Sequence, residues 1–346
     1  MLHGHGDDIY SYPDIRHNFS SNIYPGARNS ALKEHLCRNI SLIDHYPEPT
    51  PRSVERLIAS CHGIADDCVL VTNGATDAIY LIAQALAHEG YTHYTVRQPT
   101  FTEYEDACTM HGMRPLTVTP TEEQRVVSWL CNPNNPTGEV YPLTSLLPPP
   151  SSLLLPPSSF LPPPHLLTVI DQSYEAYTLH ELLTPAEAVR LGNVFQIHSL
   201  TKTYAIPGLR IGYVVAAPAL IALLRTVVRP WAVNALAIEA AKFLLEKKPL
   251  SLWSDMGRLL EEAQRLRSLL TEIPGVSVLP TSTNFMLATI DCCTAAELKA
   301  HLATEHHILI RDASNFKDLT PHHFRIAAQT PEENDLLVEA IARYVG

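Results

Sequence analysis

Short apolar runs alternate with segments of helical periodicity between about residues 66 and 216. In residues 75–86 the apolar side chains recur at the spacing of an amphipathic helix, and a second helix is predicted to carry Phe101 and Tyr104. Strands that alternate with helices indicate an α/β fold, in which a mostly parallel sheet is covered by helices on both faces. The apolar runs predict strands at 69–71, 93–96, 126–130, 166–170, 194–198 and 209–215.

The C-terminal third has a different pattern, which predicts a smaller α+β domain. A long amphipathic helix is expected at 256–273. Beyond it the pattern predicts a strand around 284–290, a helix from 295, a strand at 308–311 and a final helix from 332. The predicted division is an N-terminal arm at 1–25 that contributes to the active site and the small domain, a large domain at 26–234, and a small domain at 235–346.

A proline-rich stretch interrupts this alternation at residues 148–164, which read PPPSSLLLPPSSFLPPP. A crossover helix is expected between two parallel strands, but repeated prolines are incompatible with a helix interior. We therefore predict an irregular, polyproline-like surface crossover. A recruitment motif for a proline-binding partner is the alternative interpretation.

Composition and charge exclude several classes of function. The chain has 346 residues, of which 46% are hydrophobic and 18% are charged, as expected for a globular protein with a large core. The formal net charge of −11 argues against a nucleic acid or an anionic membrane as the main partner. A small anionic substrate stays possible, because a few arginines set the field of a cleft whatever the total charge.

The cysteines and the start of the chain favour a cytoplasmic protein. Seven cysteines are an odd number without metal-ligand spacing, so reduced thiols are expected. No segment has the length of a membrane span, and the start MLHGHGDD lacks a signal-peptide pattern. His3 and His5 on a terminal arm are weak evidence for a metal, and no metal is expected.

Polar motifs that are candidates for binding or catalysis follow several of the predicted strands, and ligands bind at these strand ends in this kind of sheet. Gly74, Ala75 and Thr76 lie between a strand and a helix, so free backbone N–H groups are expected to cradle a phosphate there. A plain helix cap by a neighbouring threonine or asparagine is the alternative. Asn135 lies in the loop NPNNPTG at 132–138, whose prolines hold the amide in place.

Asp171 ends an apolar strand, and a carboxylate in that position needs a cationic partner. A protonated pyridine nitrogen would be such a partner and would make the ring a strong electron sink. Tyr174, three residues later, is placed to reach a hydroxyl of the same ring. Lys202 follows hydroxyl residues in SLTKTYAIPGLR, and Arg210 closes that run. Alone, such a lysine is a solvated surface residue.

Together these motifs resemble the fold-type I enzymes of the aminotransferase class I and II family, which depend on pyridoxal 5'-phosphate (PLP). The resemblance implies that Lys202 forms a Schiff base with PLP, that Asp171 contacts the ring nitrogen and that Asn135 and Tyr174 contact the phenolic oxygen. Phe101 would stack on the ring. The residues implied to bind the cofactor phosphate are Gly74, Ala75, Thr76, Ser199, Thr201 and Arg210, with Tyr46 reaching the phosphate of a neighbouring subunit in a homodimer with shared active sites.

A narrower resemblance is to the L-threonine-O-3-phosphate decarboxylase branch, which belongs to cobalamin biosynthesis. It is carried by the runs at 199–213, 230–237 and 308–311 and by the start of the chain. The resemblance implies decarboxylation of L-threonine O-3-phosphate to (R)-1-amino-2-propanol O-phosphate. It also implies that the phosphate and carboxylate of this phosphorylated substrate contact His5, Gly6, Asn22, Asn135, Arg311 and Arg325.

Two other functions stay open at this point. Histidinol-phosphate aminotransferases share most of the PLP motifs, so amino transfer to 2-oxoglutarate in histidine biosynthesis is the alternative. The more remote alternative is a non-catalytic module with the PLP fold. The two enzymes differ in the bond to Cα that stands perpendicular to the ring, because only that bond can pass its electrons into the ring.

Overall fold

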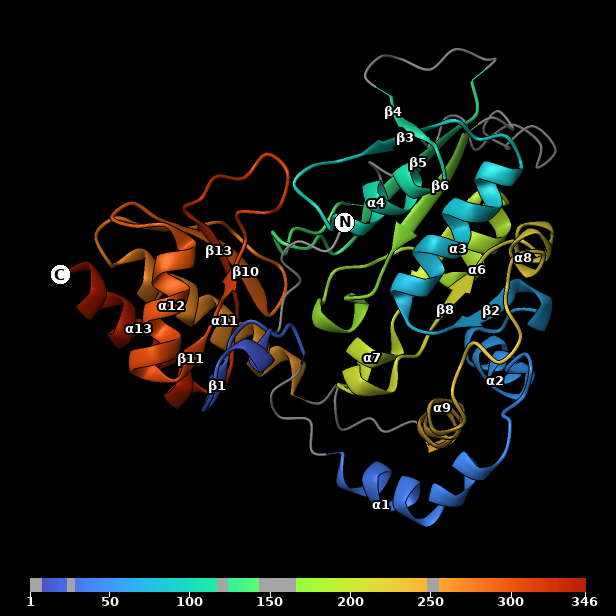
Figure 1. Cartoon of the computed structure of the whole chain (residues 1–346), viewed down its shortest axis with the longest axis horizontal. Helices are drawn as coiled ribbons and strands as arrows, with labels where there is room; N and C mark the ends of the chain where they lie inside the picture. The colour runs from blue at the N-terminus through green and yellow to red at the C-terminus, as the bar shows by residue number, and fades with distance from the viewer. Residues whose placement is uncertain (1–7, 24–28, 117–123, 143–165, 248–254) are drawn as a thin grey trace.

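A computed structural model describes residues 8–23, 29–116, 124–142, 166–247 and 255–346. A larger sheet of seven strands and a smaller sheet of four strands organise these residues, and a third sheet has only two short strands (Figure 1). The proline-rich crossover predicted at 148–164 lies outside the described residues, as do His5 and Gly6. Within the described residues, no helix combines the length and apolarity that a membrane crossing requires.

The larger sheet has seven strands in the order β2-β8-β7-β6-β5-β3-β4. Strand β8 runs antiparallel to both of its neighbours, and the remaining neighbours pair in parallel. This mostly parallel sheet confirms the predicted fold class. The strands are β2 (Val69–Thr72), β3 (His93–Val96), β4 (Arg114–Pro115), β5 (Val126–Cys131), β6 (Leu166–Asp171), β7 (Val194–His198) and β8 (Gly212–Val215).

Helices cover both faces of this sheet, which explains why its central strands are apolar on both sides. In β8, Val214 packs into the core with α3 and α8, whereas Tyr213 and Val215 pack into the core with α2 and α9. Each fully buried side chain of this size contributes about 1.5–3 kcal/mol to folding. The helices around the sheet are α1 (Ser30–Arg38), α2 (Arg52–His62), α3 (Ala75–His88), α4 (Glu103–Met110), α6 (Pro185–Leu191), α8 (Pro218–Arg225) and α9 (Ala235–Lys247).

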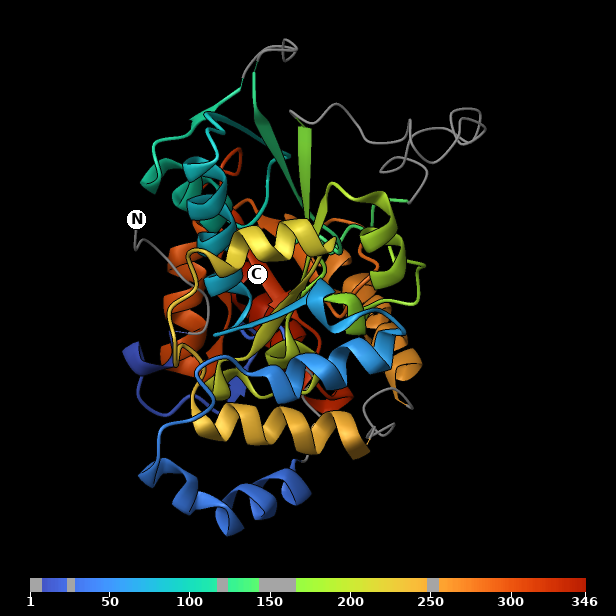
Figure 2. The same ribbon diagram turned by 90° about the vertical axis from the view of Figure 1, so that its right-hand side faces the viewer.

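Helix α9 begins at the predicted domain boundary of residue 235, yet it packs beside α1 and α2 (Figure 2). Among the described residues, the first helix that packs on the smaller sheet is α11 (Met256–Thr271). The division at residue 235 therefore stays a prediction, and by packing α9 lies with the larger sheet.

The smaller sheet is antiparallel, with four strands in the order β12-β13-β10-β9. Helices α12 (Ala295–His306) and α13 (Pro331–Val345) pack on it together with α11, and both start at a threonine capping box. The strands are β9 (Val276–Val278), β10 (Phe285–Ile290), β12 (Arg311–Asp312) and β13 (His323–Ala327).

The single strand predicted at 308–311 is divided between two sheets. Residues Ile308–Leu309 form β11, which pairs in parallel with β1 (His17–Asn18) of the N-terminal arm. Arg311 begins β12, which pairs with β13. The arm thus pairs in a separate two-stranded sheet with the segment that leads into β12, while Arg311 pairs with a different neighbour.

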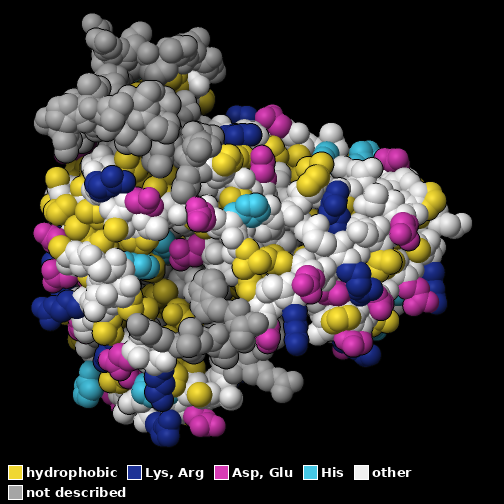
Figure 3. Space-filling model, turned by 180° about the vertical axis from the view of Figure 1, so that it is seen from behind, with side chains coloured by type: hydrophobic (Ala, Val, Ile, Leu, Met, Phe, Trp, Pro, Cys, Tyr) yellow, Lys and Arg dark blue, Asp and Glu magenta, His cyan; other side chains and the backbone are white. Residues whose placement is uncertain are grey.

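The strand predicted at 209–215 begins only at Gly212. Pro207–Leu209 form the 3-10 turn η7, and Arg210 adopts a left-handed conformation with φ 57°. Further short elements are η1 (Ile9–Ser11), η2 (Ile40–Asp44), η3 (Asp66–Cys68), η6 (Glu175–Tyr177) and the single-turn helix α7 (Leu200–Thr203). On the face seen in Figure 3, basic and acidic side chains are interspersed and gather into no patch of one sign.

Candidate active site

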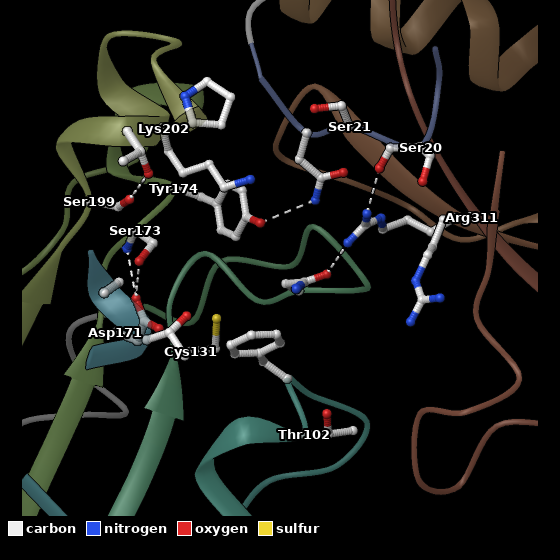
Figure 4. A pocket seen from close by; sticks show the side chains of 18 of the residues that line it. Ser20, Ser21, Thr102, Cys131, Asp171, Ser173, Tyr174, Ser199, Lys202 and Arg311 are labelled. Carbon is white, nitrogen blue, oxygen red and sulfur yellow. Dashed lines mark hydrogen bonds between the residues drawn. The ribbon is translucent and has the colours of Figure 1, made fainter. Parts of the chain in front are cut away.

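A cavity of about 250 Å³ opens between the carboxyl ends of the large-sheet strands and the smaller sheet. Figure 4 shows Asp171, Tyr174 and Lys202 on one side of it and Arg311 on the other. Thirteen of the residues predicted from the sequence line this cavity: Asn22, Ala75, Thr76, Phe101, Asn135, Asp171, Tyr174, Ser199, Thr201, Lys202, Arg210, Arg311 and Arg325.

Two further predicted residues lie elsewhere among the described residues. Gly74 lies directly behind the wall, against the Arg210 guanidinium. Tyr46 is outside the cavity and 85% exposed, with its ring 5.3 Å from that of Trp231. A role for Tyr46 in its own cavity is therefore not supported, and the predicted role in a second subunit stays a prediction.

Lys202 lies in α7, directly after β7, and its backbone is fixed by a neighbouring turn. The Tyr177 hydroxyl donates a 2.8 Å hydrogen bond to the Lys202 carbonyl oxygen. In the same turn, Glu175 pairs with His198 at 2.9 Å between Oε1 and Nδ1. The Lys202 Nζ atom lies 5.5 Å from the centre of the Tyr174 ring. The lysine amine is thus held over the cavity, close to the residue predicted to contact a ring hydroxyl.

Asp171 is 4% exposed and is surrounded by hydrogen-bond donors. Its carboxylate accepts from the Ser173 backbone N–H at 2.9 Å, from the Ser173 hydroxyl at 2.6 Å and from the Tyr104 hydroxyl at 2.8 Å. Burial raises the pKa of Asp171 above its usual value, and these hydrogen bonds lower it only in part. A buried carboxylate in this condition is stabilised by a cation, and a protonated pyridine ring nitrogen fits that requirement.

A second group of residues has the features of a phosphate cradle. Gly74 has φ 85° and ψ 170°, and α3 starts at the next residue, so backbone N–H groups of its first turn are free for an anion. The Arg210 guanidinium lies close to Gly74, where a Cβ atom would come within 2.6 Å of Nη2. The Ser199 and Thr201 hydroxyls lie 2.7 Å apart at the start of α7. Cation, hydroxyls and helix N-terminus together suit the phosphate of PLP.

Gly74→Ala is expected to weaken PLP binding by at least about tenfold. The methyl group would displace the Arg210 guanidinium, and the backbone conformation of Gly74 is one that only glycine adopts without strain. A titration of the cofactor-free protein with PLP measures the dissociation constant. Gly90→Ala is the matched control, because Gly90 also has positive φ but has no atom within 4 Å of its added Cβ. Equal losses in the two variants would contradict the cradle.

Two arginines of the smaller sheet form the opposite wall. Arg311 and Arg325 face each other in register on β12 and β13, and both are 5% exposed. Arg325 donates to Asn135 Oδ1 at 2.5 Å and to the Ser20 carbonyl oxygen at 2.8 Å. Arg311 donates to Asn315 Oδ1 at 2.7 Å. Burial lowers the pKa of Arg311, but a guanidinium stays charged in proteins.

A planar guanidinium binds carboxylates and phosphates through two parallel hydrogen bonds. The two buried guanidinium groups therefore favour a ligand with strong negative charge or with two anionic groups. Among the described residues, no cluster of three His, Cys, Asp or Glu side chains forms a metal site.

Several cavity residues were not predicted from the sequence. Ser173 had a local signal, because the backbone N–H two residues after an aspartate commonly donates to its carboxylate in an Asx turn. Asn315 lies four residues after Arg311, a weaker signal. The contact of the Ser20 carbonyl oxygen with Arg325 spans 305 positions and has no local signal. The complete group is Ser20, Ser21, Thr102, Tyr104, Cys131, Ser173, Pro207, Asn315 and Phe316.

Comparison with known proteins adds independent findings. The sequence pattern of the aminotransferase class I and II family matches residues 15–341. The threonine-phosphate decarboxylase of Salmonella typhimurium is 28% identical over 95% of this chain and 91% of its own length. The histidinol-phosphate aminotransferase of Thermoanaerobacter sp. is 26% identical over 96% of this chain and 94% of its own.

Among solved structures, L-threonine-O-3-phosphate decarboxylase from Porphyromonas gingivalis superimposes with a TM-score of 0.86. It is 34% identical to this chain, and the match covers 95% of this chain and 99% of that one. The fold is therefore shared with a solved protein over nearly the whole chain.

Proposed function

The chain belongs to the aminotransferase class I and II family, and from this membership we propose that it decarboxylates L-threonine O-3-phosphate to (R)-1-amino-2-propanol O-phosphate. It is a PLP-dependent enzyme. The cobalamin pathway is the biological context that this reaction implies.

The observation that carries the proposal is the likeness to the Porphyromonas gingivalis decarboxylase, at 34% identity over nearly the whole of both chains. The charges of the cavity are compatible with this substrate. L-Threonine O-3-phosphate carries a carboxylate and a phosphate, and the wall opposite Lys202 presents two buried arginines, Arg311 and Arg325.

Each group of cavity residues would have a separate role in the reaction. Lys202 Nζ would hold the cofactor and later return a proton to Cα of the product, while Asp171 would keep the ring nitrogen protonated. Bound PLP supplies a conjugated ring that accepts the electrons of whichever Cα bond is perpendicular to it. Arg311, Arg325 and Asn22 would hold the carboxylate and the phosphate of the substrate, and this orientation would decide which bond to Cα is cleaved. Binding and orientation by this wall would thus select the reaction.

Incubating the purified enzyme with L-threonine O-3-phosphate is expected to release one CO2 per turnover without any amino acceptor. The matched incubation contains histidinol phosphate and 2-oxoglutarate, and its readout is glutamate. Glutamate formation without CO2 release would overturn the decarboxylase in favour of the aminotransferase, which the 26% identical relative supports. A visible cofactor band with neither product would point to a non-catalytic module.

A homodimer with shared active sites is a further part of the proposal. Tyr46 and Trp231 form an exposed aromatic pair outside the cavity, and Ile40 and Ile43 of η2 are 50% and 63% exposed nearby in the sequence. Exposed apolar groups of this size favour a subunit interface. Tyr46 would reach the cofactor phosphate of the second subunit. A monomer in sedimentation velocity, or unchanged PLP affinity in Tyr46→Phe, would contradict this arrangement.

We also propose a cytoplasmic location. All seven cysteines are free thiols, three of them buried, and free thiols persist in a reducing compartment. Cell fractionation that recovers the protein outside the cytoplasm would contradict the location.

A further inference from the structure

One carboxylate joins the two walls of the cavity from outside. Glu105 belongs to α4, which covers the larger sheet, and its Oε1 atom accepts from Lys317 Nζ at 3.1 Å. Its other oxygen, Oε2, accepts from Gln98 Nε2 at 2.7 Å. Lys317 lies in the loop 313–319 beside the smaller sheet, 212 positions further along the chain. Neither Glu105 nor Lys317 lines the cavity.

On the large-sheet side, the contact leads to the residues that precede α4. Gln98 accepts a 3.2 Å hydrogen bond from the backbone N–H of Thr100 through Oε1. The Thr100 hydroxyl in turn donates to Asn134 Oδ1 at 2.8 Å. Phe101, the next residue, lines the cavity where it is proposed to stack on the cofactor ring. Glu105 thus holds the loop that presents Phe101.

On the small-sheet side, the contact leads to Arg311. Phe316 and Asn315 immediately precede Lys317 and line the cavity. The Arg311 guanidinium lies 5.6 Å from the centre of the Phe316 ring and donates to Asn315 Oδ1 at 2.7 Å. Phe316 is itself anchored in a small apolar cluster with Leu287. A displacement of Lys317 would therefore also move Asn315 and Phe316, the two side chains that orient Arg311.

We propose that Glu105 and Lys317 form a clasp across the mouth of the cavity, which fixes the spacing of its two walls and keeps Arg311 oriented toward the substrate. They are positioning residues, and the proposal rests on the substrate-binding role proposed for Arg311. The hydrogen bond to Glu105 raises the pKa of Lys317, so the ammonium stays charged. Because the Lys317 side chain is 55% exposed, the effect is modest and sensitive to salt.

Lys317→Glu is expected to raise KM for L-threonine O-3-phosphate about fivefold while kcat stays within about twofold of the wild type. The variant places two carboxylates together and separates the walls. The exchanged pair, Glu105→Lys with Lys317→Glu, is expected to bring KM most of the way back to the wild-type value. The ratio of the variant and wild-type KM values is expected to approach one at about 1 M salt.

Arg343→Glu is the matched control. Arg343 pairs with Glu339, is similarly exposed and undergoes the same change of charge, but both partners lie on α13, so this ion pair does not join the two walls. Its KM is expected to stay at the wild-type value. An equal rise of KM in this control would assign the effect to net charge and overturn the clasp.

Hydrogen exchange measures the clasp without any substrate. Backbone amides of residues 313–319 are expected to exchange about fivefold faster in Lys317→Glu than in the wild type. Their exchange rates are expected to be close to the wild-type values in the exchanged pair and unchanged in Arg343→Glu. Unchanged exchange in Lys317→Glu would overturn the proposal. If the wild type releases no CO2, the decarboxylase fails, while the exchange rates and the KM for histidinol phosphate still decide the clasp.

Discussion

Lys202→Ala is expected to lower turnover by at least about 10⁴-fold, because it removes both the amine proposed to attach PLP and the group proposed to move a proton at Cα. Few substitutions in this cavity remove two functions at once. The backbone around Lys202 is held by the Tyr177 hydroxyl and by a 3.1 Å hydrogen bond from the Lys202 backbone N–H to the Ser199 carbonyl oxygen, neither of which needs the lysine side chain. The variant is therefore expected to fold and to retain its cofactor phosphate site.

Two measurements check this result. CO2 release is expected to vanish, and the visible absorbance of lysine-bound PLP is expected to shift to that of the free aldehyde. Lys242→Ala is the control, because Lys242 pairs with Glu239 on α9, away from the cavity. A Lys202→Ala variant with wild-type turnover and absorbance would contradict the assignment of the cofactor-binding lysine.

Asp171→Asn is expected to have the second largest effect, a loss of about 10²–10³-fold in kcat. The buried carboxylate at the end of β6 is the charge proposed to keep the ring nitrogen protonated, and an amide is neutral. Without that charge the ring is a weaker electron sink, so the transition state of Cα bond cleavage is less stabilised. The amide is nearly the same size, which limits the change in packing.

Ser173→Ala tests the hydrogen bonds of the Asp171 carboxylate separately from its charge. The variant keeps the Asp171 carboxylate but removes the 2.6 Å hydrogen bond from the Ser173 hydroxyl, which lowers the Asp171 pKa in the wild type. Its kcat is expected to fall about tenfold, less than in Asp171→Asn. Kinetics and PLP titrations of both variants are compared. An Asp171→Asn variant that keeps half of the wild-type kcat would contradict the role of the carboxylate.

Local sequence patterns predicted most elements of the larger sheet. The strand at 93–96 has the predicted bounds, and the strands near 69, 126, 166 and 194 differ from prediction by at most one residue at their ends. Their apolar runs are buried on both faces, which leaves little ambiguity in the pattern. Prediction failed where strands are short, because the run at 308–311 carries no signal that it pairs with two different partners.

The candidate site residues show the same contrast between features with a local signal and contacts between distant segments. Gly74 and Asp171 became candidates because they lie at or just after the end of an apolar strand, a local relation, whereas Lys202 became one only through the resemblance of the combined motifs to a known family. Tyr104 was predicted to lie in a helix, but its hydrogen bond to Asp171 spans 67 positions. That contact depends on how α4 packs on the sheet, which local periodicity does not specify.

By itself the sequence determined the fold class and placed several polar motifs at strand ends, because these follow from short-range patterns and from strand ends that share one edge of a sheet. The PLP family and the roles of the motif residues came from the resemblance of those motifs to known enzymes. Only the tertiary structure decided how the two walls meet. The register that brings Arg311 opposite Arg325, the hydrogen bond of Arg325 to Asn135 and the clasp between Glu105 and Lys317 all join distant segments. Such contacts depend on the packing of the two sheets against each other, which is a property of the whole core.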